Sequence, residues 1–240
     1  MKFLYLVIDA GTIIIPFLFS FHPKLSFFKY WKYAWPAIII SAAIFIIWDI
    51  YFTSIGVWGF TAQYLNGLYL YNIPIEEFLF FICIPYACLF TYYCLGILIR
   101  KDLFSGISKW ISAILIVGLA TTAIFNPGRS YTSVTFFLLA IMILVLQYGI
   151  KAKWLSRFYF SYLVLLIPFS IVNGILTGAT LEKPVVWYNN AQNLGIRLGT
   201  IPIEDIFYGM LLFLLNVLLF EHFKSRYHSG KGRIAYSSRP

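Results

Sequence analysis

Apolar residues in this chain gather into seven runs, each close to the length of a membrane-spanning helix. A bilayer core is crossed by roughly 20 consecutive apolar residues in a helix. Runs near that length cover residues 3–21, 34–52, 75–99, 110–126, 133–150, 158–177 and 204–222. The first run lacks the small-residue cleavage site of a signal peptide, so we expect it to remain as a helix. The pattern predicts an all-α integral membrane protein of about seven transmembrane helices.

Composition supports this prediction and excludes the usual soluble classes. Hydrophobic residues make up 61% of the 240, and charged residues only 11%, whereas a soluble domain carries about 25% charged residues. So few charges are too sparse to cover a water-facing surface. The net charge of +9 is typical of basic loops on the cytoplasmic side of a membrane, and we expect no nucleic-acid partner.

Lysine and arginine predict the orientation of these helices. All but four of the 18 basic residues lie in the segments after the first, third, fifth and seventh runs. The other four are Lys2, Arg129, Lys183 and Arg197. Because basic loops stay in the cytoplasm, we expect a multi-pass cell-membrane protein with its N-terminus outside and its C-terminus inside.

A short motif occurs twice and indicates an internal repeat. The sequence Ile-Pro-Ile-Glu-Glu at 73–77 matches Ile-Pro-Ile-Glu-Asp at 201–205, and each copy begins an apolar run. Upstream, Phe45 and Asp49 match Phe169 and Asn173. Three spans reverse the side of the membrane and a connecting fourth restores it, so the two units are parallel and both motifs enter from the outer face.

The repeat predicts the organisation of the chain. We expect a first three-helix unit over residues 1–100, a connector helix over 101–130, a second three-helix unit over 131–223 and a basic cytoplasmic tail over 224–240.

Acidic residues at membrane depth are the strongest functional signal. Six of the nine acids lie in or at the mouth of an apolar run: Asp9, Asp49, Glu76, Glu77, Glu204 and Asp205. A charge at mid-helix costs roughly 2.5–3.5 kcal/mol on the insertion scale, so such residues usually mark a working site. A simpler interpretation is a proline and an acid that begin a helix and complement its dipole. Doubled acids at matching repeat positions favour a site.

The geometry of a helix separates the roles of the two acids in each motif. Adjacent residues point about 100° apart, so we expect the first acid to bond back to the helix start and the second to turn into the bundle. Carboxyl groups from both units would repel one another if all were ionised. One that keeps its proton is a general acid.

Other residues near the motifs are candidates for support. Asp49 and Asn173 lie at similar depth and would orient the acids, although a packing contact between helices explains them equally well. The role of Asp9 stays open between a site member and a packing residue. The loops before the two motifs add candidates that would line a pocket and stabilise a cation, or form an interfacial aromatic belt. These are Trp58, Tyr64, Trp187, Tyr188, Asn189 and Arg197.

Together the two motifs resemble the lycopene cyclase domain family in its tandem, fused form. Residues 173–178 (Asn-Gly-Ile-Leu-Thr-Gly), 186–189 (Val-Trp-Tyr-Asn) and 195–202 are similar to the signature of its second unit. The resemblance implies a lycopene β-cyclase of carotenoid biosynthesis, which isomerises the linear ψ ends of lycopene to β-rings through γ-carotene. For that reaction Glu77 and Asp205 are our first choice as the acid–base pair, with Glu76 and Glu204 as partners that set pKa and position. Which acid of each pair donates the proton stays open. Lycopene and γ-carotene would arrive from the lipid phase.

No cofactor or metal site is expected. No Gly-x-Gly-x-x-Gly motif follows a strand, which argues against a bound flavin or nicotinamide. The three cysteines, in one apolar run, match no metal-binding spacing. Two alternatives stay open: a carotenoid hydratase, in which water captures the same cation, and a proton-coupled transporter. The sequence leaves open one ring or two, β or ε product, and the oligomeric state.

Overall fold

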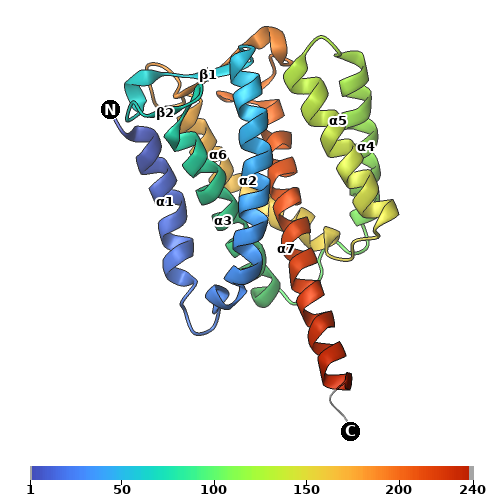
Figure 1. Ribbon diagram of the computed structural model, residues 1–240. Coiled ribbons are helices and arrows are strands. Elements are labelled where there is room, and N and C mark those ends of the chain that lie inside the picture. Colours follow the sequence, from blue (N-terminus) through green and yellow to red (C-terminus); the bar gives the residue numbers. More distant parts are fainter. Residues whose placement is uncertain (1, 238–240) are drawn as a thin grey trace.

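The computed structural model describes the backbone of residues 2–237 and the side chains of residues 2–227. Within this part the chain forms a bundle of seven α-helices (Figure 1). They are α1 (Leu4–Phe19), α2 (Trp31–Ser54), α3 (Ile75–Leu98), α4 (Ser108–Phe125), α5 (Ser130–Leu144), α6 (Leu155–Leu176) and α7 (Ile203–Ser237). A 3-10 turn, Phe27–Tyr30, precedes α2, and a π-helical turn, Val145–Gly149, extends α5. The predicted all-α fold is confirmed.

Six of the seven helices are long and apolar enough to cross a membrane, and α1 is the exception. Its 16 residues extend about 24 Å, whereas the bilayer core is about 30 Å thick. The predicted run, 3–21, was longer. The helix stops at Phe19, and Pro23 follows three residues after Ser20. Since proline disfavours a helical residue before it, the chain turns here instead of continuing.

The helices of the two predicted units interleave. Helix α1 packs against α3, and α5 packs against α7, as expected for a repeat. In addition, α2 packs against α7, and α3 contacts α6, so helices of the first unit pack directly against helices of the second (Figure 1). Helix α4 packs on α5 at one side. Helices α3 and α7 therefore lie together in the middle of the bundle and start at the same end.

Short strands in the two long loops cover that end (Figure 1). Each loop ends in a small hairpin whose second strand is the Ile-Pro start of the motif: β2 (Tyr69–Leu70) with β3 (Ile73–Pro74), and β5 (Arg197–Leu198) with β6 (Ile201–Pro202). The loops are joined by β1 (Trp58–Phe60) and β4 (Val186–Tyr188), which pair antiparallel with Trp58 opposite Tyr188. Short 3-10 turns, Ala62–Tyr64 and Asn190–Gln192, complete them.

A glycine allows the two loops to meet. A Cβ at Gly59 would lie 2.3 Å from the ring of Trp187, its partner in the β1–β4 pair. That distance is well inside van der Waals contact, so any larger residue at position 59 would separate the loops.

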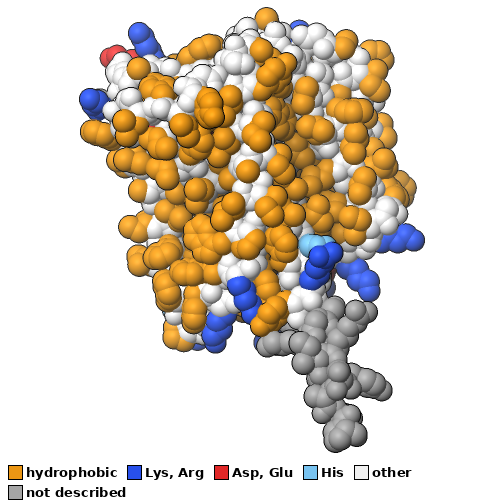
Figure 2. All heavy atoms as spheres, in the orientation of Figure 1, with side chains coloured by type: hydrophobic (Ala, Val, Ile, Leu, Met, Phe, Trp, Pro, Cys, Tyr) orange, Lys and Arg blue, Asp and Glu red, His pale blue; other side chains and the backbone are white. Residues whose placement is uncertain are grey.

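The surface matches a chain surrounded by lipid. Large apolar side chains are exposed along the helices, for example Ile47 on α2 and Ile114 on α4, which are 69% and 70% exposed. Figure 2 shows apolar atoms over the helical faces, with lysine and arginine gathered mainly at the end opposite the strands. The chain is a multi-pass membrane protein.

Candidate active site

A cavity of about 720 Å³ lies beneath the strand-covered end of the bundle. Residues of α1, α3, α6 and α7 line it, and β1 and β4 form its roof. Among the lining side chains are one acid from each motif, Glu77 and Asp205, together with Asp49 and Asn173. The structure thus brings together four of the residues that the sequence singled out.

Glu77 lies in the first turn of α3 and is 8% exposed. The hydroxyl of Tyr5, on α1, donates a hydrogen bond of 2.6 Å to Glu77 Oε2. Asp49 of α2 lies nearby, and its Oδ1 accepts a hydrogen bond from the Trp58 indole. The second oxygen, Asp49 Oδ2, has no partner within the described residues. Glu77 is within electrostatic range of both Asp49 and Asp205.

Asp205 occupies the matching position of α7 but has more hydrogen-bond donors. Tyr131, on α5, donates to Oδ1 at 2.6 Å. Asn173 Nδ2 and the hydroxyl of Tyr188 donate to Oδ2 at 2.6 and 2.9 Å. Burial and the neighbouring Asp205 carboxyl raise the pKa of the Tyr188 phenol well above its ordinary value, so it remains a donor.

Local sequence explains why these acids reach the cavity. Pro74 and Pro202 stand directly before α3 and α7 in extended strands. Proline disfavours a helical residue before it, so neither helix extends further toward its loop. Both acids of each motif therefore fall in the first helical turn. The β1–β4 pair places Trp58 and Tyr188 opposite each other at the roof, where both line the cavity.

Glu76 and Glu204 point away from the cavity lining. Glu76 Oε1 accepts a hydrogen bond of 2.7 Å from the backbone N–H of Asn66, and Glu204 Oε1 accepts one of 2.7 Å from that of Leu194. Thr132 Oγ1 also donates to Glu204 Oε1, at 2.6 Å. Each first acid therefore fixes its loop to the helix start, and each second acid turns inward, as the helical rotation predicts.

The remaining predicted support residues lie in the two loops before the motifs. Of these, Trp58 and Tyr188 line the cavity, whereas Tyr64 is buried in the apolar cluster under the loops. Trp187 is 43% exposed. Asn189 accepts a hydrogen bond from Ala191 N, and the Arg197 guanidinium donates to Thr200 O and Asn190 Oδ1. A direct role of these residues in substrate binding stays a prediction.

Three tyrosines of the site escaped the sequence argument: Tyr5, Tyr131 and Tyr208. Tyr208 lines the cavity within electrostatic range of Asp49, Glu77 and Asp205. Its ring contacts those of Trp58 and Tyr131. Helical spacing offered one signal, since Tyr208 lies three residues after Asp205, as Phe80 does after Glu77. Tyr5 and Tyr131 lie near the start of the first helix of each unit. Only a full alignment of the two repeats would reveal that their positions match.

Asp9 is buried without a hydrogen-bond partner in the described part of the chain. It lies within electrostatic range of Glu76 and does not line the cavity. Its role stays open between the two interpretations above.

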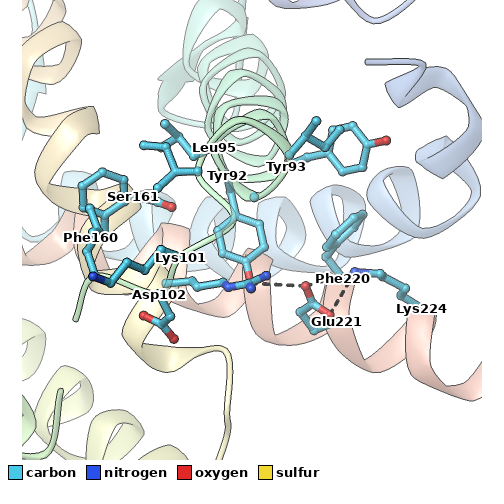
Figure 3. A pocket seen from close by; sticks show the side chains of 15 residues that line it. Tyr92, Tyr93, Leu95, Lys101, Asp102, Phe160, Ser161, Phe220, Glu221 and Lys224 are labelled. Atoms are coloured by element: carbon cyan, nitrogen blue, oxygen red, sulfur yellow. Dashed lines mark hydrogen bonds and ion pairs between the residues drawn. The ribbon is translucent and has the colours of Figure 1, made fainter. Parts of the chain in front are cut away.

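A second, smaller cavity of about 190 Å³ lies at the opposite end of the bundle. Figure 3 shows Tyr92 pointing at Glu221, to which it donates at 3.2 Å, and Lys224 forming an ion pair with Glu221 at 3.4 Å. Lys101 and Arg157 also line it. Charged side chains line this cavity and one of them pairs with the Glu221 carboxylate, so the cavity is poorly suited to a hydrocarbon.

One comparison with known proteins gives a match. A family model described as Lycopene cyclase matches residues 2–95 and 128–223, one range in each half of the chain. Comparisons with curated proteins and with solved structures give no match.

Proposed function

The chain belongs to the lycopene cyclase family, and we propose that it closes β-rings on the ψ ends of lycopene, with Glu77 as general acid and Asp205 as general base. One observation carries this proposal: two carboxyls from the two halves of the chain line a single, mostly apolar cavity within electrostatic range of each other. Ring closure of a hydrocarbon needs one proton donor and one proton acceptor, and no other reactant.

The steps balance without an oxidant or reductant. Glu77 gives its proton to C2 of the terminal double bond, which leaves a tertiary cation at C1. The electron pair of the C5=C6 bond attacks C1, closes the six-membered ring and moves the cation to C5. Asp205 takes the proton from C6, and a C5=C6 double bond forms again. Loss of the C6 proton defines the β-ring, and the product is an isomer of the substrate.

Hydrogen bonding supports the division of roles between the carboxyls. Three side chains donate to Asp205, and each donor stabilises the ionised form. Glu77 receives one donor, Tyr5, and has the Asp49 carboxyl as a neighbour, which disfavours a second negative charge. A proton shared within this site therefore belongs on Glu77, and Asp205 is the carboxylate that accepts one.

Aromatic rings surround the place where the cation forms. Trp58, Tyr208 and Phe80 line the cavity together with the carboxyls. A ring face stabilises a nearby cation by roughly 0.5–2 kcal/mol. These rings also exclude water, which would otherwise capture the cation and give the hydrated product of a hydratase.

The proposal includes the orientation of the chain in the membrane and the phase from which the substrate comes. The basic residues gathered at the end opposite the strands (Figure 2) support a cytoplasmic C-terminus and a carboxyl site near the outer leaflet. Lycopene and γ-carotene are hydrocarbons, so we expect them to reach the site from the lipid phase. The two family-matched ranges support a first unit at 1–100 and a second at 131–223, joined by α4 within 101–130.

Expression in cells that accumulate lycopene tests the proposed function. Pigment analysis should show γ-carotene and β-carotene. Hydroxylated lycopene would indicate a hydratase, and ε-ringed products would show that the proton leaves C4 instead of C6. Unchanged lycopene, with the protein present in the membrane, would contradict the proposal and favour the transporter alternative.

A further inference from the structure

The cavity that holds the two carboxyls continues as an elongated groove along α3. Its α3 lining includes Glu77, Phe80, Ile84, Cys88 and Thr91, which lie on one face of the helix. At 1.5 Å per residue, the distance along the helix from Glu77 to Thr91 is about 21 Å. The carboxyls therefore occupy one end of a long groove.

The groove opens to the surface between α1 and α6. Ile15 of α1 and Ile171 of α6 both line it, yet they are 62% and 61% exposed. Gly11 of α1 and Pro168 of α6 also line it and are exposed. Residues that border the groove and also reach the outer surface mark its mouth. Since this surface is apolar, the mouth faces the acyl chains of the bilayer.

Away from the carboxyls the groove offers little to a polar ligand. Its lining near the mouth is mostly aliphatic. The threonine hydroxyls there already donate hydrogen bonds to backbone carbonyls of their own helices. Thr12 donates to Asp9 O at 2.8 Å, and Thr91 donates to Ala87 O at 2.9 Å. The hydroxyl of Tyr162 likewise donates to the backbone carbonyl of Ile206. A hydrocarbon fits such a groove, because it requires no hydrogen bonds.

The two carboxyls come from matching positions of the two repeats, but matching helices of the repeats contribute unequally to the lining of the groove. Helices α1, α3, α6 and α7 each contribute several lining residues, whereas α2 contributes Asp49 and α5 contributes Tyr131. The cavity thus extends from the carboxyls toward one side of the bundle.

We propose that this groove is the binding site for one arm of the polyene, which enters from the lipid between α1 and α6. This inference rests on the proposed function. The end group lies at Glu77 and Asp205, the conjugated arm lies along α3, and the other arm stays in the bilayer. Lycopene is about as long as the 30 Å bilayer core, so the groove of about 21 Å holds only part of it. Each ring is consequently closed in a separate binding event.

The variant Gly11→Trp tests the groove. A Cβ at Gly11 meets no atom within 4 Å in the described residues outside its own helix backbone and chain neighbours, so a side chain added here starts in open space at the mouth. The matched control is Gly118→Trp on α4, an exposed helical glycine with the same open surroundings. Both purified proteins are assayed in proteoliposomes with lycopene and with a short hydrocarbon that carries the same end group and no long arm.

The expected result is a selective loss. Gly11→Trp should slow cyclisation of lycopene by about tenfold or more, since displacing a substrate by 1 Å alone costs about 100-fold. It should retain cyclisation of the short substrate, which also shows that the variant is folded. Gly118→Trp should match the wild type on both substrates.

The failures are distinguishable. If Gly11→Trp cyclises lycopene at the wild-type rate, or loses both substrates equally, the groove is not the arm site, although the proposed function stands. If the wild type forms no ring from lycopene, the proposed function itself fails.

Discussion

The two carboxyls of the cavity occupy matching positions of a repeat, yet their surroundings differ. Glu77 has Tyr5 as its donor and the Asp49 carboxyl as a neighbour, whereas Asp205 has Tyr131, Tyr188 and the Asn173 amide. The decisive difference is Asp49 in one half and Asn173 in the other. An amide donates a hydrogen bond to a carboxylate, which a second carboxylate does not. Duplication thus supplied two acids, and in the proposed mechanism the divergence of their neighbours separates the proton donor from the proton acceptor.

The largest effect should come from removing the proton donor. Glu77→Gln keeps the shape of the side chain but has no acidic proton, and general acid–base catalysis contributes about 10²- to 10⁴-fold. Protonation of an alkene is the difficult step, so we expect loss of ring formation toward the upper end of this range. Conversion of lycopene in proteoliposomes measures it. Glu182→Gln, an exposed acid on the loop before β4, is the control and should behave as the wild type.

Removing the acceptor should cost less. In Asp205→Asn the ring still closes, but proton loss from the cation lacks its base, so we expect a decrease of about 10²-fold and a mixture of ring isomers. Chromatography of the products measures both. If Asp205→Asn were more damaging than Glu77→Gln and gave no change of isomers, the assigned roles would be reversed or wrong.

Replacing the amide beside Asp205 with an acid should make its surroundings resemble those of Glu77. Asn173→Asp removes a donor from Asp205 and adds an acid beside it, so Asp205 becomes a poorer carboxylate. One hydrogen bond to a charged group contributes about 1.5–3 kcal/mol, which predicts a rate lower by roughly tenfold to 100-fold. Asn173→Gln, which keeps the amide, is the companion variant. Equal rates for Asn173→Asp and the wild type would show that the amide is not needed.

The tyrosine donors should give a smaller, graded effect. Tyr131→Phe leaves Asp205 with two donors and adds no acid beside it, so we expect a loss at the lower end of that range, about tenfold. Tyr33→Phe, at a buried tyrosine of α2 that does not line the cavity, is the matched control and should leave turnover unchanged. Initial rates with lycopene compare them.

The smallest effect on turnover belongs to the residues that fix the loops. Thr132→Val removes the side-chain donor to Glu204, while the Leu194 N–H remains, so stability should fall by about 1 kcal/mol. Thermal unfolding in detergent measures this decrease, and activity well below the transition should be unchanged. A large loss of activity without a change in stability would mean that Glu204 contributes to the chemistry and does more than fix the loop.

The local features of the site were largely predictable. The two motifs set two acids in the first turn of α3 and α7, and the rotation between adjacent helical residues assigned one acid to the loop and the other to the bundle. Tyr5 and Tyr131 were missed because they lie on other helices than the two motifs. Nothing local to Tyr5 or Tyr131 indicates that α1 packs on α3, or α5 on α7.

The sequence by itself determined the helices, the repeat and the paired acids, because hydrophobic period and motif spacing are properties of the chain read in order. The tertiary structure alone decided which groups donate to each acid, and that the cavity extends on the α1–α6 side of the bundle. Those outcomes depend on contacts between helices distant in sequence. A repeat that looks symmetric along the chain becomes asymmetric where different side chains from each half share one space.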